Sequence, residues 1–356
     1  MSRPATARIH LDHLRHNFRL LGQKSGSATI MAIVKANAYG HGLQLVAPTL
    51  ADEGCTRFGV TDASEGAQLR ALLPDAPAAE ITLLSGIFDA EDAGLAREHG
   101  LTPALTGPEQ VRLLAAVGFS GSIWIKLDTG MKRLGAEPAT ELLTACREAG
   151  LGIAGLMSHL ACADEPGHPQ NMAQAENFLR FRQQLGMQLP TSLLNSAGML
   201  TLADSAGDVV RPGIALYGAE PIPSRPIGLK PVMQLTGHII QTRDLQAGDS
   251  VSYGASFTAR QPMRIATVCL GYADGLPRQL SNTGYGMLDG RKAPIVGRVC
   301  MDYTLIDVSD IHAAPGDEVE FWGDQLDANI VAEQAGTISY TLFTGIGQRV
   351  HRVPVP

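Results

Sequence analysis

The sequence predicts an α/β protein, in which an N-terminal (β/α)8 barrel of the TIM type precedes a mostly antiparallel β domain. From residue 29 to about 218, short apolar or β-branched runs alternate with longer amphipathic stretches, giving eight units in under 200 residues. This alternation is typical of parallel strands joined by helices, and the count of eight favours a closed barrel over a doubly wound open sheet. Beyond residue 231 the sequence pattern changes and predicts short strands separated by turns. A chain of 356 residues also exceeds what one hydrophobic core normally serves, which favours two domains.

The strands of the barrel follow from the apolar runs in chain order. Between them, the helical periodicity predicts amphipathic helices over Asp62–Leu73, Pro108–Val117 and, as the longest, residues 170–185. The predicted strands are Thr29–Val34, Phe58–Val60, Ile81–Leu84, Pro103–Thr106, Ile123–Asp128, Ile153–Met157, Thr191–Leu194 and Asp208–Val210.

A linker and a second domain follow. Residues 218–231 hold four prolines, so we expect a barrel domain over residues 1–224 and a β domain over residues 225–356. A short helix near residues 327–335 and a last strand towards Val350 complete the prediction. The predicted strands of this domain are Val232–Thr242, Ser250–Tyr253, Ile265–Leu270, Ala293–Val299, Tyr303–Val308 and Glu318–Trp322.

Composition limits the kinds of partner. The net charge is −7, from 28 Lys and Arg against 35 Asp and Glu, with no basic run, which argues against nucleic-acid binding. Apolar stretches are too short for a membrane span, and the first residues show no apolar signal-peptide core. The five cysteines have no paired or metal-type spacing, and we expect reduced, buried thiols. Together these features predict a soluble cytoplasmic protein.

Reactive side chains follow several of the predicted barrel strands. A barrel enzyme works at the C-terminal ends of its strands, where the loops converge. A lysine, a histidine, a serine and two arginines at one rim are a more specific signal than any of them alone. These residues are Lys35 after the first strand, Arg133 beyond the fifth, His159 after the sixth, Ser196 after the seventh and Arg211 after the eighth.

The segment around Lys35 suggests a cofactor. A lysine at the end of a buried strand loses hydration, which favours the neutral amine that forms a Schiff base with an aldehyde. Tyr39 could face the same site, and the turn after the eighth strand offers free N–H groups of Gly213 and Ile214, where barrels commonly bind phosphate. A lysine that forms a Schiff base beside a phosphate pocket points to pyridoxal phosphate, with a phospho-sugar aldolase as the rival interpretation.

The sequence around Lys35 resembles the cofactor-binding signature of the alanine racemase family. The resemblance extends over essentially the whole chain, and its motifs occur in family order. They are AIVKANAYGHG from residue 32, LDTGMKRLG from 127, MSHL from 157, NSA from 195, VRPGI from 210, SYGA from 252, GYADG from 271, RVCMD from 298 and ISY from 338. The family fold, a barrel plus a β domain in a dimer, agrees with the fold predicted above.

The resemblance implies a mechanism and a role for each matching residue. Lys35 would carry pyridoxal 5'-phosphate covalently as an aldimine and act as base on the D face of alanine, with Tyr253 as base on the L face. His159 would bridge Tyr253 to Arg211, and Arg211 would face the pyridine nitrogen. Because an arginine only donates, the nitrogen would stay unprotonated, which favours racemisation over transamination. The phosphate would bind Tyr39, Ser196, Tyr340 and the N–H groups of Gly213 and Ile214.

The same resemblance implies a homodimer with shared active sites. Tyr253 and the Met301 backbone N–H would come from the partner subunit, Met301 binding the substrate carboxylate together with Arg133, and Tyr272 would line the entrance. Lys126 matches a position that can be carbamylated, and an ammonium beside Arg133 would otherwise be repelled. We expect the two tryptophans in the core, no metal site, and peripheral positions for His10, His13, His16 and His41.

Three alternatives are weighed against alanine racemisation. A non-catalytic pyridoxal-phosphate-binding barrel protein would lack the Tyr253, Tyr272 and Met301 motifs. A related two-domain decarboxylase would place a glutamate where Arg211 stands. A racemase acting on serine or other small amino acids is a narrower rival, because a hydroxyl adds little bulk. Whether D-alanine would serve peptidoglycan or be degraded stays open at this point.

Overall fold

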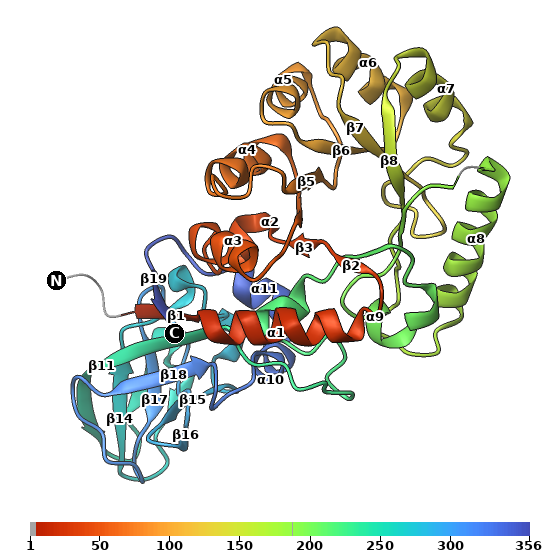
Figure 1. Cartoon of the computed structure of the whole chain (residues 1–356). Coiled ribbons are helices and arrows are strands. Elements are labelled where there is room, and N and C mark those ends of the chain that lie inside the picture. Colours follow the sequence, from red (N-terminus) through yellow and green to blue (C-terminus); the bar gives the residue numbers. More distant parts are fainter. Residues whose placement is uncertain (1–4, 187) are drawn as a thin grey trace.

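The protein has two lobes in the computed structural model, which describes residues 5–186 and 188–356 (Figure 1). One lobe is a ring of strands surrounded by helices, and the other is built on a twisted sheet formed mainly by strands beyond residue 232. Residues 1–4, which belong to the expected first domain and to the stretch searched for a signal peptide, lie outside the described residues.

The first lobe is a closed parallel barrel. Neighbouring strands pair in parallel from β3 through to β9, and β10 pairs with β2. Closure between β9 and β10 comes from a bridge between Asn195 and Arg211, whose N–H donates to the Leu194 carbonyl at 2.9 Å. The strands are β2 (Thr29–Ile30) and its continuation β3 (Ala32–Ile33), β4 (Arg57–Val60), β5 (Glu80–Leu83), β6 (Thr102–Leu105), β7 (Ser122–Lys126), β8 (Gly152–Met157), β9 (Thr191–Ser192) and β10 (Val209–Val210). The barrel prediction is confirmed.

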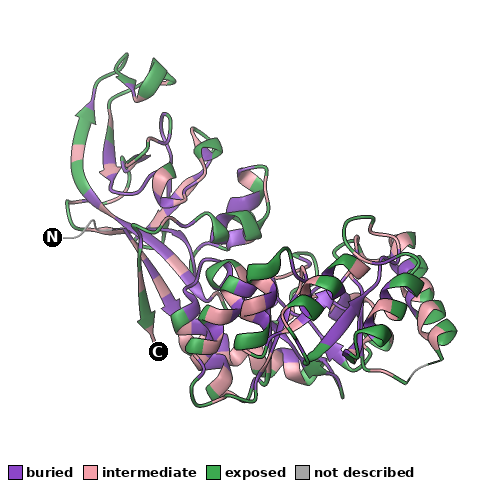
Figure 2. Ribbon diagram, turned by 90° about the horizontal axis from the view of Figure 1, so that it is seen from above, coloured by how far each residue is buried: buried purple, intermediate pink, exposed green. Residues whose placement is uncertain are grey.

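Helices cover the outside of the barrel and begin at residues suited to capping. Asp62 and Asp89 accept the N–H groups of Glu65 and Asp92, and Pro108 occupies the first turn of its helix. The helices are α1 (Leu11–Lys24), α3 (Leu43–Asp52), α4 (Ala63–Ala71), α5 (Ala90–Glu98), α6 (Pro108–Ala116), α7 (Thr140–Glu148), α8 (Pro169–Leu185) and the short α9 (Gly198–Thr201). The strands between them are almost wholly buried (Figure 2).

The second lobe is built around one long strand. β11 (Met233–Leu245) pairs antiparallel with β1, β14 and β18 along different parts of its length. The other strands are β12 (Ser250–Val251), β13 (Phe257–Thr258), β14 (Met263–Val268), β15 (Tyr285–Leu288), β16 (Arg291–Pro294), β17 (Thr304–Asp307), β18 (Glu318–Trp322) and β19 (His351–Val355). Two short helices, α10 (Ala328–Gln334) and α11 (Ser339–Thr344), connect β18 to the last strand, and α11 faces the barrel.

The start of the chain corrects the expected domain division. β1 (Ala5–His10) lies in the second sheet, antiparallel to β11 and parallel to β19, although residues 1–224 were assigned to the barrel. Its side chains alternate between buried and half-buried, and Arg8 donates to both oxygens of Glu318 at 2.7 and 2.5 Å. The strand therefore ties the beginning of the chain to its end, across a separation that no local pattern reveals.

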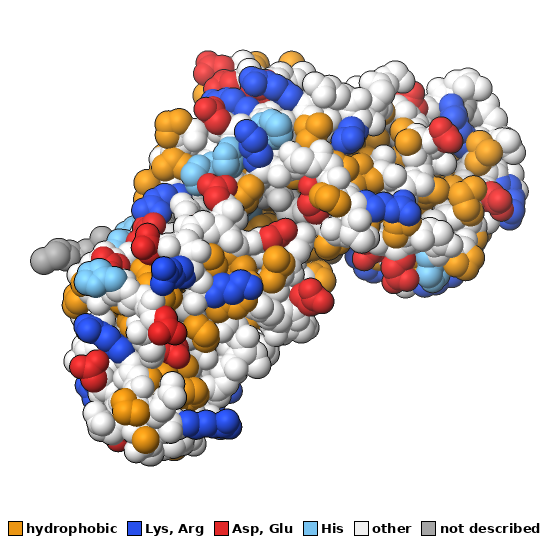
Figure 3. Space-filling view, turned by 90° about the horizontal axis from the view of Figure 1, so that it is seen from below, with side chains coloured by type: hydrophobic (Ala, Val, Ile, Leu, Met, Phe, Trp, Pro, Cys, Tyr) orange, Lys and Arg blue, Asp and Glu red, His pale blue; other side chains and the backbone are white. Residues whose placement is uncertain are grey.

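The cores and the surface agree with most of the remaining expectations. Trp124 and Trp322 are fully buried, as predicted. Among the cysteines, Cys162 and Cys300 are only partly buried, which corrects the expectation of buried thiols. Basic and acidic side chains intermingle on the face in Figure 3, and no helix among the described residues is long and apolar enough to cross a membrane.

Candidate active site

A cavity of about 600 Å³ opens at the C-terminal ends of the barrel strands, against α11 of the second lobe. All the barrel residues predicted for the site line it, and Tyr340 joins them from α11. These residues are Lys35, Tyr39, Lys126, Arg133, His159, Ser196, Arg211, Gly213, Ile214 and Tyr340. These side chains share one cavity, as the sequence predicts, because parallel strands end at the same face of a barrel.

Lys35 begins an unusual turn after β3. Residues 36–39 all have positive φ, between 51° and 54°, so that α2 (Lys35–Tyr39) is largely a left-handed turn. Consecutive non-glycine residues in this region are strained and need support from their surroundings. Glu65 supplies it by accepting the Ala36 N–H at 2.6 Å and the Thr61 N–H at 2.8 Å. The turn brings Lys35 and Tyr39 to the same cavity, and Glu65 is a positioning residue that nothing in the sequence singled out.

The Lys35 amine is suited to nucleophilic chemistry. Burial lowers its pKa, and the positive charge of Arg133 lowers it further, while Glu65 acts in the opposite direction. A lowered pKa increases the fraction of the neutral amine, which is the form that attacks a carbonyl.

Arg211 and His159 form a contact at the centre of the cavity. Arg211 is 4% exposed, and its guanidinium donates to the Ser192 hydroxyl and the Ser158 carbonyl, both at 2.5 Å. Its Nη2 also lies 3.2 Å from His159 Nδ1. Because an arginine only donates, Nδ1 must accept, which leaves the ring proton on Nε2.

The charge states of this pair follow from burial. Burial and the neighbouring Arg211 hold the pKa of His159 well below its usual range, so the imidazole is neutral. Burial also lowers the pKa of Arg211, to about 10, which still leaves the guanidinium charged at neutral pH. The predicted contact between His159 and Arg211 is present, whereas Tyr253 lies outside the cavity.

The turn after β10 forms a small cradle. The Gly213 N–H donates to the Ser196 hydroxyl at 2.9 Å, which corrects the expectation that this N–H is free. A Cβ at residue 213 would stand 2.5 Å from the Tyr39 hydroxyl, so only glycine lets the two segments approach this closely. Burial raises the pKa of Tyr39, and that of Tyr340 to about 12. Both phenols are therefore protonated and can donate hydrogen bonds to an anion.

An aromatic layer supports the cradle from behind. Tyr39 stacks on Tyr217 at 4.9 Å between ring centroids, and His41 lies 4.5 Å from Tyr217 and 5.0 Å from Phe343. His41 is fully buried, and burial lowers its pKa to about 3. Its expected peripheral position is therefore wrong, because the left-handed turn folds it inward.

Lys126 and Arg133 occupy the side of the cavity next to β7. Lys126 donates to the Leu84 carbonyl at 2.6 Å. Burial, with the charges of Arg211, Arg133 and Lys35, lowers its pKa to about 7. Arg133 is exposed in the loop after β7, and its side chain makes no hydrogen bond or ion pair within residues 5–186 and 188–356.

Three predicted residues lie away from the cavity of this chain. Tyr253, Tyr272 and Met301 are 70%, 42% and 52% exposed on the second lobe. They are near one another, since the Tyr272 N–H donates to the Cys300 carbonyl at 2.9 Å and the Ser252 hydroxyl lies 3.6 Å from Cys300 Sγ. One chain thus presents the cavity and, separately, an exposed patch formed by these two tyrosines and the methionine.

Comparisons with known proteins agree with one another along the whole chain. The family model described as the N-terminal domain of alanine racemase matches residues 9–221, and that of the C-terminal domain matches residues 232–354. An alanine racemase from Azoarcus sp. (strain BH72) is 41% identical over 98% of this chain and 99% of its own.

Solved structures give the same result. A crystal structure described as the biosynthetic alanine racemase from Pseudomonas aeruginosa superimposes with a TM-score of 0.92 and 39% identity, covering 99% of this chain and all of the other. A structure of alanine racemase from Bartonella henselae, described as having covalently bound pyridoxal phosphate, superimposes with a TM-score of 0.91 and 34% identity, covering 99% of each chain.

Proposed function

The chain belongs to the alanine racemase family, whose members use pyridoxal phosphate, and from this premise we propose that it interconverts L-alanine and D-alanine with Lys35 and Tyr253 as the two bases. The observation that carries the proposal is the cavity at the barrel mouth, where a partly buried lysine of lowered pKa shares the lining with the paired Arg211 and His159. When bound, the cofactor withdraws electron density from the substrate Cα and makes its proton acidic.

The residues of the cavity fit this cofactor. Lys35 would hold it covalently, and the volume of about 600 Å³ is within the range of small-molecule sites. Tyr39, Ser196, Tyr340 and the Ile214 N–H would bind the phosphate, and the Gly213 N–H would do so in place of its bond to the Ser196 hydroxyl. Glycine at 213 lets the Tyr39 hydroxyl approach this turn, so that the phenol and the N–H groups of the turn can reach the same anion.

Two bases are needed because racemisation removes a proton from one face of Cα and returns one to the other. We assign Lys35 to the D face and Tyr253 to the L face. An ordinary tyrosine has a pKa near ~10, so Tyr253 needs electrostatic help to act as a base. His159, neutral and oriented by Arg211, would give that help as a donor through Nε2–H.

Arg211 would face the pyridine nitrogen of the cofactor and determine the outcome of the reaction. A guanidinium cannot accept a proton, so it cannot keep that nitrogen protonated as a carboxylate would. Arg211 would thereby moderate the electron withdrawal that the cofactor supplies, which would favour return of the proton to Cα and racemisation with little transamination.

The substrate carboxylate would bind Arg133 and the Met301 backbone N–H. We further propose that Lys126 is carbamylated, because its neutral amine can add to carbon dioxide, releasing a proton and leaving an anion beside Arg133. That anion would orient the exposed guanidinium, which otherwise has no partner within the described residues.

A second copy of the chain would complete the site. Tyr253, Tyr272 and Met301 form an exposed patch that does not line the cavity of their own chain, so in this proposal they serve the cavity of a partner, with Tyr272 at its entrance. Exposed aromatic and methionine side chains gathered in one patch are typical of an interface. The protein would therefore be active as a homodimer.

Borohydride reduction followed by peptide mapping tests the cofactor linkage. We expect an absorption band near ~420 nm in the purified protein and a reduced label on Lys35, with no label in Lys35→Ala. We also expect Tyr253→Phe to abolish turnover of L-alanine, while Tyr285→Phe, which alters a tyrosine of β15 in contact with Lys292, leaves it intact. A colourless protein that takes up no pyridoxal phosphate would overturn the proposal.

The choice of substrate can be measured on the same sample. Comparing kcat/KM for alanine and serine decides between an alanine racemase and one of broader specificity. A labelled Lys35 without turnover of either amino acid would instead favour a non-catalytic binding protein. The proposed cellular role of the product is the supply of D-alanine for peptidoglycan, with degradation of D-alanine as the alternative.

A further inference from the structure

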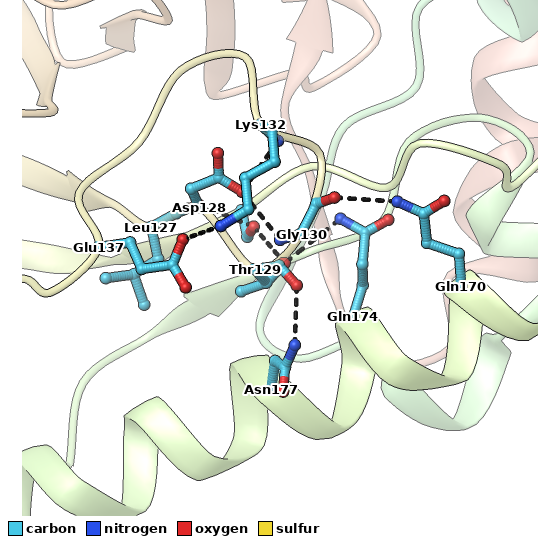
Figure 4. A network of polar contacts seen from close by, with 10 residues as sticks. Leu127, Asp128, Thr129, Gly130, Lys132, Glu137, Gln170, Gln174 and Asn177 are labelled. Carbon is cyan, nitrogen blue, oxygen red and sulfur yellow. Dashed lines mark hydrogen bonds and ion pairs between the residues drawn. The ribbon is translucent and has the colours of Figure 1, made fainter.

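The inward face of α8 carries a row of amide side chains that hold the loop bearing Arg133. We call residues 127–135 the arginine loop. Gln170, Gln174 and Asn177 are spaced four and three residues apart, so they lie on one side of the helix (Figure 4). Gln170 Nε2 donates to the Gly130 carbonyl at 2.9 Å, and Asn177 Nδ2 donates to the Thr129 carbonyl at 3.0 Å.

Gln174 differs from its two neighbours because it bonds two segments of the site at once. Its Nε2 donates to the His159 carbonyl at 2.8 Å and to the Thr129 hydroxyl at 3.4 Å, while its Oε1 accepts the Ala161 N–H at 2.8 Å. The side chain is 1% exposed, so water cannot replace these bonds. The amide orientation is unambiguous, since Ala161 offers a donor and His159 an acceptor.

The hydroxyls next to Gln174 extend this connection. Ser158 donates to the Leu127 carbonyl at 2.8 Å, so the Thr129 hydroxyl, 2.8 Å from Ser158 Oγ, donates to it and accepts from Gln174. The result is a directional chain of hydrogen bonds from Gln174 through Thr129 and Ser158 to Leu127. A chain of this kind couples the backbone of the arginine loop to the segment that carries His159.

Arg133 depends on this coupling. Its side chain is exposed and makes no hydrogen bond or ion pair with the described residues, so its position is set by the backbone of the loop. His159, on the other segment, is fixed through Arg211. The separation between the carboxylate-binding arginine and the histidine is thus determined by the bonds that join the two segments.

We propose that Gln174 is a positioning residue for the substrate carboxylate: by bonding Thr129 and His159 together, it holds the arginine loop at the distance from the catalytic segment that an amino acid of alanine's size requires. This inference rests on the proposed function, which assigns the carboxylate to Arg133. The effect is one of geometry, and Gln174 itself does not line the cavity.

The test replaces Gln174 in two ways and measures carboxylate binding apart from catalysis. Gln174→Met fills a similar volume without hydrogen bonds, and Gln174→Glu keeps the acceptor for Ala161 but cannot donate to His159 O. Gln184→Met makes the same exchange on the exposed side of α8 and is the matched control. Propionate, which has the carboxylate of alanine but no amine, is the binding probe, and its Kd is measured on the cofactor-loaded protein.

We expect both Gln174 variants to raise the propionate Kd and the alanine KM by about 10-fold, with kcat lowered less than about 3-fold, as for a misplaced binding group. The ~420 nm band and its reduction onto Lys35 should be unchanged, since the cofactor contacts are elsewhere. Gln184→Met should match the wild type. Thr129→Val removes the hydroxyl that links Gln174 to Ser158 and should raise the propionate Kd and the alanine KM in the same way. It provides the test if Gln174→Met does not fold.

Two results would overturn the assignment. The first is normal propionate binding in both folded Gln174 variants. The second is a wild-type propionate Kd and alanine KM in Gln174→Glu alone, because this would show that only the bond to Ala161 matters. These outcomes are distinct from failure of the proposed function. A wild-type protein that carries no cofactor or turns over no alanine would overturn the proposed function, whatever the variants do.

Discussion

Lys126 shows how burial changes the chemistry of a single side chain. With a pKa lowered to about 7 from 10.5, its amine is largely charged at pH 6 and largely neutral at pH 8. Only the neutral form adds to carbon dioxide, and the addition releases a proton, so both effects favour the carbamate as the pH rises.

We therefore expect carbamylation of Lys126 to increase at least about 10-fold between pH 6 and pH 8 at a fixed concentration of dissolved carbon dioxide. The measurement is ¹³C NMR of protein equilibrated with labelled bicarbonate, in which a carbamate resonance appears and is lost in Lys126→Met. Lys132→Met is the control, because the ion pair with Glu137 raises the pKa of Lys132 and keeps that amine charged. A resonance that persists in Lys126→Met would assign the carbamate to another residue.

The left-handed turn of α2 shows how one element is held by another. Gly40 ends this turn at φ 78°, and a Cβ there would stand 2.0 Å from the Phe343 carbonyl oxygen of α11. Arg352 of β19 donates to the Gly40 carbonyl at 2.6 Å. The turn that carries Lys35 is therefore fixed against two elements of the second lobe.

Gly40→Ala should reduce the free energy of unfolding by more than about 3 kcal/mol, because the methyl group forces α2 and α11 apart. Gly26→Ala is the control that measures the cost of backbone strain without a steric clash. Gly26 also has a positive φ, 62°, but a Cβ there meets nothing within 4 Å, so we expect a loss of only about 1 kcal/mol. Denaturant unfolding measures both variants, and equal losses would show that the contact with α11 contributes nothing.

At the scale of the whole molecule, the proposed active site needs two chains. Neither Lys35→Ala nor Tyr253→Phe should turn over L-alanine as a homodimer. In a mixed dimer, the wild-type Lys35 of one chain would meet the wild-type Tyr253 of the other and restore one intact site. Refolding the two variants together in equal amounts should recover about a quarter of wild-type activity.

A control distinguishes this recovery from incomplete inactivation. Lys35→Ala mixed with the double variant Lys35→Ala/Tyr253→Phe has no intact lysine and should stay inactive. If the first mixture also stays inactive while native mass spectrometry shows mixed dimers, the two residues act within a single chain and the shared site is wrong.

Local sequence patterns predict the barrel and the residues at its rim. Strand and helix periodicities are local, and parallel strands end at one face, so the sequence predicts that Lys35, His159 and Arg211 meet, and all three line the cavity. The motif resemblance added Tyr340, which lines the same cavity from the second lobe.

The distant segments that support this site become apparent in the folded chain. β1 joins the second sheet through partners hundreds of residues away, and Arg8 and Glu318 are 310 positions apart in the sequence. Glu65 and Gln174 were not predicted, because each acts through hydrogen bonds to backbone atoms of other segments, which have no residue-specific pattern. The periodicity of a sequence specifies what each segment forms locally, whereas the bonds that position a reactive side chain depend on which segments the completed fold brings together.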